Sequence, residues 1–186
     1  MTGTAATTQR LSMAGYAACV WAVLFAAVSF YWAAGGTIGV ETNAPAITRP
    51  VLDREPGAIA MMWATGLLKI VAGALALALV RPWGRTAPRW LLLTAGWGAA
   101  AVMGLYEGLA SLVQHALMVA DVIDTPSGLG ERSARWHLGL WDPWWLVGGV
   151  LFALATLSYQ RSVAGEISRR TIRRRRHRGL PTRRSR

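Results

Sequence analysis

The sequence predicts an all-α polytopic membrane protein, a bundle of four transmembrane helices, and three observations lead to this fold class. First, four apolar stretches cover residues 11–34, 57–80, 90–120 and 143–160. A hydrocarbon core about 30 Å thick needs about 20 helical residues, so each stretch can cross it, the last one narrowly. Second, arginine residues gather in alternate connections. Third, tryptophan and tyrosine mark the ends of the stretches, as they do at membrane interfaces.

The length of the chain leaves room for one domain. A chain of 186 residues is too short for four spans and a folded soluble domain as well. We therefore expect a transmembrane domain over residues 11–160, a cytoplasmic tail at residues 1–10, and a basic cytoplasmic tail without regular structure at residues 161–186. The first stretch is longer than the apolar core of a signal peptide, about 7–15 residues, so we interpret it as a retained span.

The distribution of basic residues predicts that both termini face the cytoplasm. Of the 20 lysine and arginine residues, fifteen would lie on one side of the membrane and four on the other. Cytoplasmic connections carry the excess of these residues. This orientation places two loops of about 20 residues outside and one tight turn inside.

The net charge of +11 is concentrated in the last 26 residues, which hold eleven arginines. Because this tail is tethered beside the inner leaflet, we expect it to contact anionic lipid headgroups rather than nucleic acid. The arginines that would make this contact are Arg169, Arg170, Arg173, Arg174, Arg175, Arg176 and Arg178.

Polar side chains inside the second and third spans form a predicted intramembrane seam. An ionisable residue in a span is costly and is a functional hypothesis by default. On each span, small residues lie on the same helix face as these polar side chains and form a stripe with them. Such stripes favour close packing of the two spans against each other. An ion pair between Lys69 and Glu107 would offset the cost of burying both charges. The seam consists of Lys69, Glu107, Ser111, Gln114 and His115.

A further set of residues is expected at the outer surface. Glycines after the first span and tryptophans before the fourth outline a shallow pocket for a lipid or another hydrophobic molecule, although an aromatic belt would leave the same pattern. Asp142-Pro143 is typical of a helix start, because the carboxylate caps free amides and proline suits the first helical position. The pocket residues are Trp32, Gly35, Gly36, Trp141, Asp142, Trp144 and Trp145.

The sequence predicts no metal site and no cofactor. Acidic residues and a histidine surround the mouth of the third and fourth spans, but their spacing matches no recognised site. His115 has no histidine in a second span to join it as a ligand. Cys19 is the only cysteine, which excludes a disulfide within the chain. The outer set is Asp121, Asp124, Glu131, His137 and Asp142.

Two segments resemble a bacterial family of small four-helix membrane proteins of unknown function. Residues 30–39, Phe-Tyr-Trp-Ala-Ala-Gly-Gly-Thr-Ile-Gly, resemble its Tyr-Trp-x-x-Gly-Gly signature. Residues 141–149, Trp-Asp-Pro-Trp-Trp-Leu-Val-Gly-Gly, resemble the start of the last helix in actinobacterial members. The resemblance implies the four-span arrangement and no particular activity.

No motif identifies a reaction, since the chain lacks Cys-x-x-Cys, His-Glu-x-x-His and Gly-x-Ser-x-Gly. We therefore expect a structural or accessory membrane protein that binds lipid or a partner membrane protein. Two other classes stay open. One is a small transporter or channel that uses Lys69, Glu107 and His115. The other is an intramembrane enzyme that acts on a hydrophobic substrate.

Overall fold

The computed structural model describes residues 2–126 and 129–178, with side chains over residues 13–126 and 129–165. Every regular element in these ranges is a helix, and none of the described residues forms a strand. Four helical segments are long and apolar enough to cross a membrane, namely Met13–Ala33, Pro56–Ala78, Arg89–Val119 and Glu131–Gly165. The predicted all-α fold with four such helices is therefore confirmed.

The first half of the chain is a helical hairpin whose connection carries two short helices. Its long helices are α1 (Thr2–Ala33) and α3 (Pro56–Ala78), and the connection holds the 3-10 helix η1 (Val40–Thr42) and α2 (Pro45–Leu52). Both α2 and α3 begin with proline, which has the backbone angle of a first helical residue and no amide hydrogen left unbonded.

In the second half, each long segment is interrupted by a π-helix. After the 3-10 helix η2 (Pro82–Thr86), the third segment consists of α4 (Arg89–Ala101), the π-helix η3 (Val102–Ala110) and α5 (Ser111–Val119). The fourth consists of α6 (Glu131–Trp136), the π-helix η4 (His137–Trp141) and α7 (Asp142–Arg178). π-Helical turns are rare and are frequently found at functional sites.

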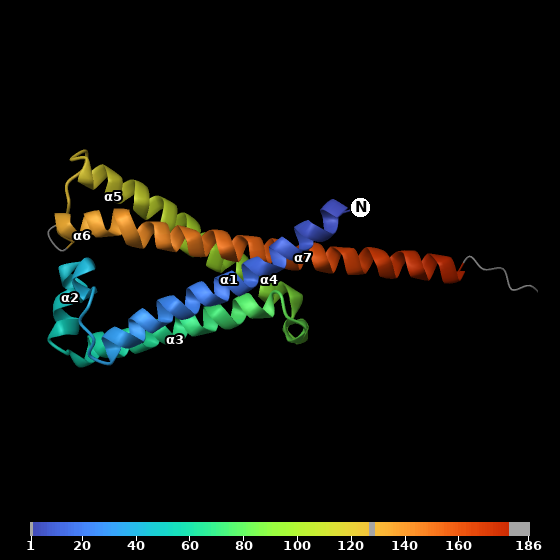
Figure 1. Ribbon diagram of the computed structural model, residues 1–186, viewed down its shortest axis with the longest axis horizontal. Coiled ribbons are helices and arrows are strands. Elements are labelled where there is room, and N and C mark those ends of the chain that lie inside the picture. The colour runs from blue at the N-terminus through green and yellow to red at the C-terminus, as the bar shows by residue number, and fades with distance from the viewer. Residues whose placement is uncertain (1, 127–128, 179–186) are drawn as a thin grey trace, which may run out of the picture.

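The long helices pack as two pairs that meet along α1 and α7. α1 lies along α3, and α7 lies along α4 and η3 (Figure 1). Small residues let the backbones approach: Gly73 faces Ala22 of α1, and Gly104 lies against Gly149 of α7. The predicted stripes are therefore packing surfaces. The prediction that they pack against each other is wrong, because each stripe faces a different helix.

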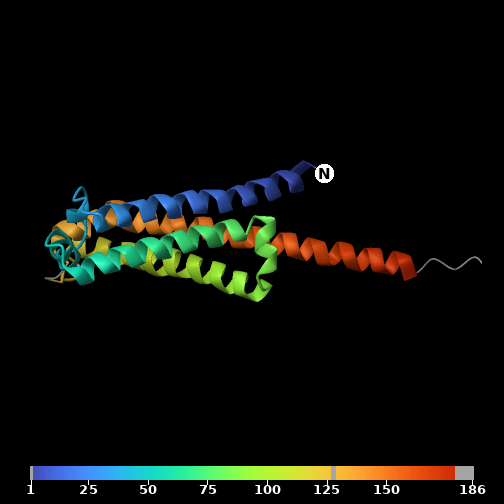
Figure 2. The same cartoon turned by 90° about the horizontal axis from the view of Figure 1, so that it is seen from below.

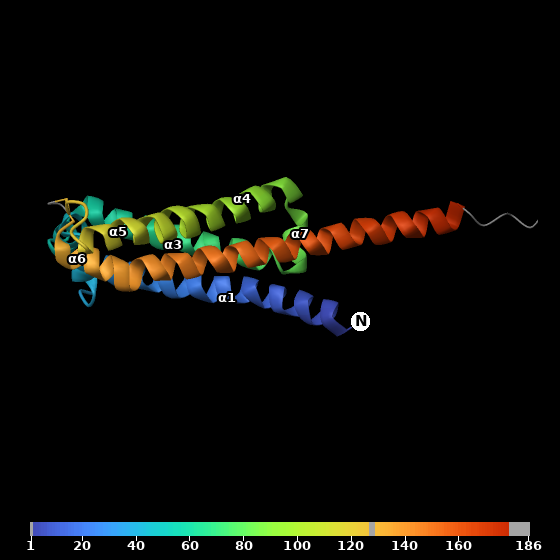
Figure 3. The same ribbon diagram turned by 90° about the horizontal axis from the view of Figure 1, so that it is seen from above.

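Both ends of the described chain lie at the same end of the bundle. The start of α1 and the far end of α7 point the same way, and η2 lies at that end too (Figures 2 and 3). α2 and α6 lie at the opposite end, which we call the loop end (Figure 1). This arrangement is the one that four crossings of a membrane require.

An aromatic cluster fills the space between α1 and α7. Trp21 and Phe25 are buried, and Trp21 stacks on Trp144 with ring centroids 5.9 Å apart. The indole nitrogen of Trp21 donates a hydrogen bond of 3.0 Å to the carbonyl oxygen of Trp144. Phe25 lies edge-on to Trp145, with centroids 4.7 Å apart. Such ring pairs add about 0.5–1.5 kcal/mol each beyond the burial of their area.

At the loop end, side chains from the two connections join the helix ends. Arg54 donates hydrogen bonds of 3.3 and 3.0 Å to the carbonyl oxygens of Trp32 and Ala33 at the end of α1, where helical carbonyls lack partners within the helix. The carbonyl oxygen of Trp32 also accepts a 3.1 Å bond from the backbone amide of Gly35. The hydroxyl of Ser133 in α6 donates a 2.6 Å bond to the carbonyl oxygen of Asn43. The two connections at the loop end therefore form one cap over the bundle.

Candidate functional site

Two histidines and an aspartate form a buried cluster near the loop end. The Nδ1 of His115 donates a 2.7 Å hydrogen bond to Oδ2 of Asp142, and the Nδ1 of His137 lies 3.6 Å from Oδ1 of the same carboxylate. The imidazole rings lie 4.8 Å apart between centroids. The side chain of Asp142 is 1% exposed, that of His115 11% and that of His137 25%. A carboxylate buried so completely needs compensating partners.

Three helical elements position this cluster. His115 belongs to α5, four residues before its end at Val119. His137 is the first residue of η4, and Asp142 follows the last residue of η4 directly. In η4 the backbone hydrogen bonds join residues five apart, which is also the spacing of His137 and Asp142. The π-helix therefore contributes to placing both side chains beside His115. Donor atoms from all three residues lie within 4.8 Å of one another.

Two expectations about these residues are wrong. Asp142 is not a helix cap: its φ of −65° and ψ of −45° are helical, the helix continues from α6, and the carboxylate bonds to His115 instead. His115 also has a histidine neighbour, because the fourth membrane-spanning segment begins at Glu131 and includes His137. The apolar run begins later than the helix, so hydropathy alone placed His137 in a loop.

Glu107 comes one residue before Gly108, which packs against the backbone of Leu146, four residues after Asp142 in α7. It belongs to η3 and is partly buried. Among the described residues, no lysine or arginine pairs with either carboxylate. The histidine cluster therefore has a second carboxylate on a neighbouring part of the same helix pair, and histidines are the partners that the structure gives to Asp142.

The rest of the predicted seam is divided between the two helix pairs. The ammonium group of Lys69 donates a 2.6 Å hydrogen bond to the hydroxyl of Ser29 and lies 3.9 Å from the ring centroid of Phe25. Lys69 thus bonds to α1 rather than to Glu107. Ser111 donates a 3.2 Å bond back to the carbonyl oxygen of Tyr106, and Gln114 is exposed.

The tryptophans of the predicted outer pocket contact one another and the core. Trp32 is buried and meets Trp141 edge-on, with ring centroids 5.9 Å apart. Trp144 and Trp145 belong to the aromatic cluster described above. Gly35, with a φ of 107°, turns the chain sharply after the first span, and Gly36 lies against the ring of Tyr31. Lipid binding by this set stays a prediction.

An apolar groove opens between η3 and α7 on the outside of the bundle. It extends from Trp97 and Ala153 to Leu109 and Leu146, has Gly104 and other small residues along its floor, and has a volume of about 280 Å³. The groove is deepest at the glycines, because they have no side chains to fill it, and the exposed Leu105 and Val150 form its edges. Side chains at the groove are tryptophan, leucine, valine and alanine, so it suits a hydrocarbon.

The outer acidic residues do not form a single site. Asp121 and Glu131 line a small polar pocket of about 100 Å³ at the loop end, together with Met118 and Ala134. Asp124 is exposed. The side chains of the seven tail arginines lie outside the described residues, so their contact with lipid stays a prediction.

These observations define a small helical protein with four helices of membrane-spanning length and a buried histidine–carboxylate cluster. The chain belongs to the family described as protein of unknown function (DUF3995), whose model matches residues 22–152. That range includes His115, His137, Asp142 and both resemblance segments. No curated protein and no solved structure matches the chain. The expected membership in a family of unknown function is confirmed, and a bacterial origin stays a prediction.

Proposed function

We propose that the protein is an accessory protein of the bacterial inner membrane that binds a lipid acyl chain in the groove between η3 and α7. The groove carries this proposal, because it is apolar and open to the side of a bundle whose four long helices are consistent with a membrane protein. In a bilayer, such a surface faces hydrocarbon rather than water. The aromatic cluster beneath it is closed by ring contacts, which suits a structural role.

The size of the groove supports a single chain. From Trp97 to Leu109 the third segment rises about 18 Å, at about 1.5 Å per helical residue. Half of a hydrocarbon core about 30 Å thick is about 15 Å. The groove therefore extends over about one leaflet's depth. Its volume of about 280 Å³ is just below the range that is typical of ligand sites, about 300–1,000 Å³.

The charge distribution supports an orientation with both termini in the cytoplasm. The start of α1 and the end of α7 share one end of the bundle (Figure 3), and the arginine-rich tail follows α7. This orientation places the loop end outside and brings the tail beside the inner leaflet, where each basic residue gains about 1 kcal/mol from anionic lipid. The orientation is tested by fusing, after Arg186, a reporter enzyme that is active only outside the cytoplasm. Activity of this fusion would contradict the proposed orientation.

The groove is tested by measuring the lipids that the purified protein retains. Mass spectrometry of the full chain, extracted from its membrane in mild detergent, should detect bound phospholipid. Ala101→Phe places a ring in the groove and should reduce the retained lipid. Ala64→Phe, at an exposed position on α3 away from the groove, is the matched control and should retain as much as the original protein.

Two results would overturn the proposal. Equal lipid retention by both variants would show that lipid binds elsewhere on the bundle. A photoreactive side chain at Leu105 that crosslinks to a membrane protein and not to lipid would show that the groove is an interface for a partner helix.

A further inference from the structure

We infer that His115, His137 and Asp142 bind a divalent transition metal ion, with Zn²⁺ as the ion whose chemistry fits best. Zinc takes imidazole nitrogen and carboxylate oxygen as ligands, and two histidines with one carboxylate are a recurrent set for it. Such a site is independent of the lipid groove, which none of the three side chains lines.

The spacing of the donor atoms is close to that of a metal site. Two ligands about 2.0–2.2 Å from a tetrahedral ion are roughly 3.3–3.5 Å apart. The Nδ1 of His137 lies 3.6 Å from Oδ1 of Asp142, and the donors of all three residues fall within 4.8 Å. The Nδ1 of His115 is closer to the carboxylate, at 2.7 Å, because a hydrogen bond joins them. Metal binding would release the proton of that bond or turn the ring to offer its other nitrogen.

One atom of the cluster lacks a partner. Oδ1 of Asp142 is buried and accepts no hydrogen bond from the described residues. An unsatisfied buried acceptor costs about 1–3 kcal/mol, and more when it is charged. This oxygen faces the Nδ1 of His137 at a distance too long for a hydrogen bond. A metal ion bound between the two would satisfy both atoms at once.

The local charge also favours a cation. Asp142 and Glu107 bring two carboxylates to the loop end of the bundle, and none of the described lysines or arginines neutralises them. A divalent ion would balance both charges.

The polar pocket at the loop end offers an entry path. It lies about one helical turn outward of the cluster, because Met118 follows His115 by three residues and Ala134 precedes His137 by three. Asp121, Glu131 and Arg135 line it, and Arg135 pairs with Glu131 at 4.0 Å, so Asp121 is the lining carboxylate that would attract cations from the outer solution. His137, the most exposed ligand, stands on this side.

Metal binding is tested on the full chain in detergent, freed of metal with a chelator and then titrated with Zn²⁺. The original protein should bind one ion per chain. His137→Ala removes a partly exposed ligand and should weaken Zn²⁺ binding by about 100-fold. Loss of a residue that only hydrogen-bonds to a metal ligand already lowers metal affinity by about 10- to 100-fold. His177→Ala removes the third histidine, which lies in the basic tail, and should bind as the original protein does.

A second measurement requires no variant. The chain has only three histidines, so isotope labelling of histidine gives three imidazole signals. Zn²⁺ should shift two of them and leave that of His177 unchanged. Absence of binding by the original protein, equal affinity in His137→Ala, or a shift at His177 alone would overturn the inference.

Discussion

The indole nitrogen of Trp141 donates a 3.1 Å hydrogen bond to the hydroxyl of Thr42, which joins the end of η4 to the loop after α1. Trp141 also stacks on Phe25 and meets Trp32 edge-on, each with ring centroids 5.9 Å apart. Trp32 in turn donates a 3.0 Å bond to the carbonyl oxygen of Ile38. The two segments that resemble the family signature, far apart in the chain, therefore meet at these two tryptophans.

Replacing Thr42 should destabilise the fold. Thr42→Val keeps the shape of the side chain but removes the acceptor for Trp141 and the 2.6 Å bond to the carbonyl oxygen of Gly39. Leaving buried polar atoms unsatisfied should lower the free energy of unfolding by about 1–3 kcal/mol. Thermal unfolding in detergent, followed by tryptophan fluorescence, measures the change. Thr37→Val, at an exposed position in the same loop, should have little effect, and an equal loss in both variants would contradict the role of the bond.

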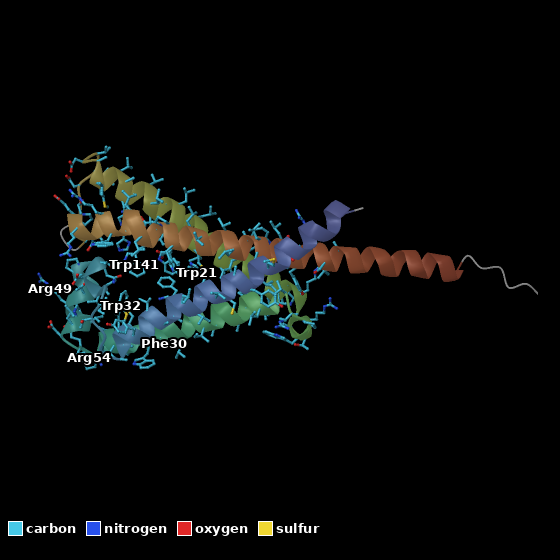
Figure 4. All side chains as sticks on the ribbon, in the orientation of Figure 1. Trp21, Phe30, Trp32, Arg49, Arg54 and Trp141 are labelled. Atoms are coloured by element: carbon cyan, nitrogen blue, oxygen red, sulfur yellow. The ribbon has the colours of Figure 1, made fainter. Side chains whose placement is uncertain are left out.

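Arg54 should stabilise the end of α1 through its hydrogen bonds to Trp32 and Ala33. Arg54→Gln loses two bonds from a charged donor, and because the site is largely exposed we expect a loss of about 1 kcal/mol. Arg49 is the matched control, since it projects from α2 in the same loop (Figure 4). Arg49→Gln should leave the melting temperature unchanged. If both substitutions lower the melting temperature equally, the effect comes from the loss of positive charge and not from the hydrogen bonds of Arg54 to the end of α1.

Lys69 and Glu107 should contribute to stability independently. Lys69 bonds to Ser29 of α1, whereas Glu107 lies near Asp142 of α7. Substitutions at sites without shared partners add within about 0.3–0.5 kcal/mol. Lys69→Met combined with Glu107→Gln should therefore give the sum of the single effects, while Lys69→Met combined with Ser29→Ala should not. Coupling between the first two substitutions would show that the two charges interact after all.

Hydropathy and charge predicted the four helices and the shared end of the termini, because both depend on the composition of long segments. They did not predict which helices pack together. Gly66, Gly73, Gly104 and Gly108 marked packing faces correctly, but small residues fit any neighbour of complementary shape. The site was missed for a different reason. A π-helix and an early helix start place His137 beside Asp142, and neither feature leaves a signal in hydropathy.

The close approach of Gly104 and Gly149 should be essential to the pairing of η3 with α7. A Cβ atom on Gly149 would collide with the backbone of Gly104, which cannot move aside without separating the helices. Gly149→Ala should therefore lower the free energy of unfolding by about 1–3 kcal/mol, as overpacking does in well-packed cores.

Gly98 provides the opposite case in the same long helical segment as Gly104. It lies in α4, and a Cβ atom there would meet nothing within 4 Å. Because alanine favours a helix over glycine by about 0.5–1 kcal/mol, Gly98→Ala should raise the melting temperature while Gly149→Ala lowers it. The test is to compare the melting temperatures of the two single variants with that of the original protein. A stabilising Gly149→Ala would mean that the two helix backbones do not touch at this point.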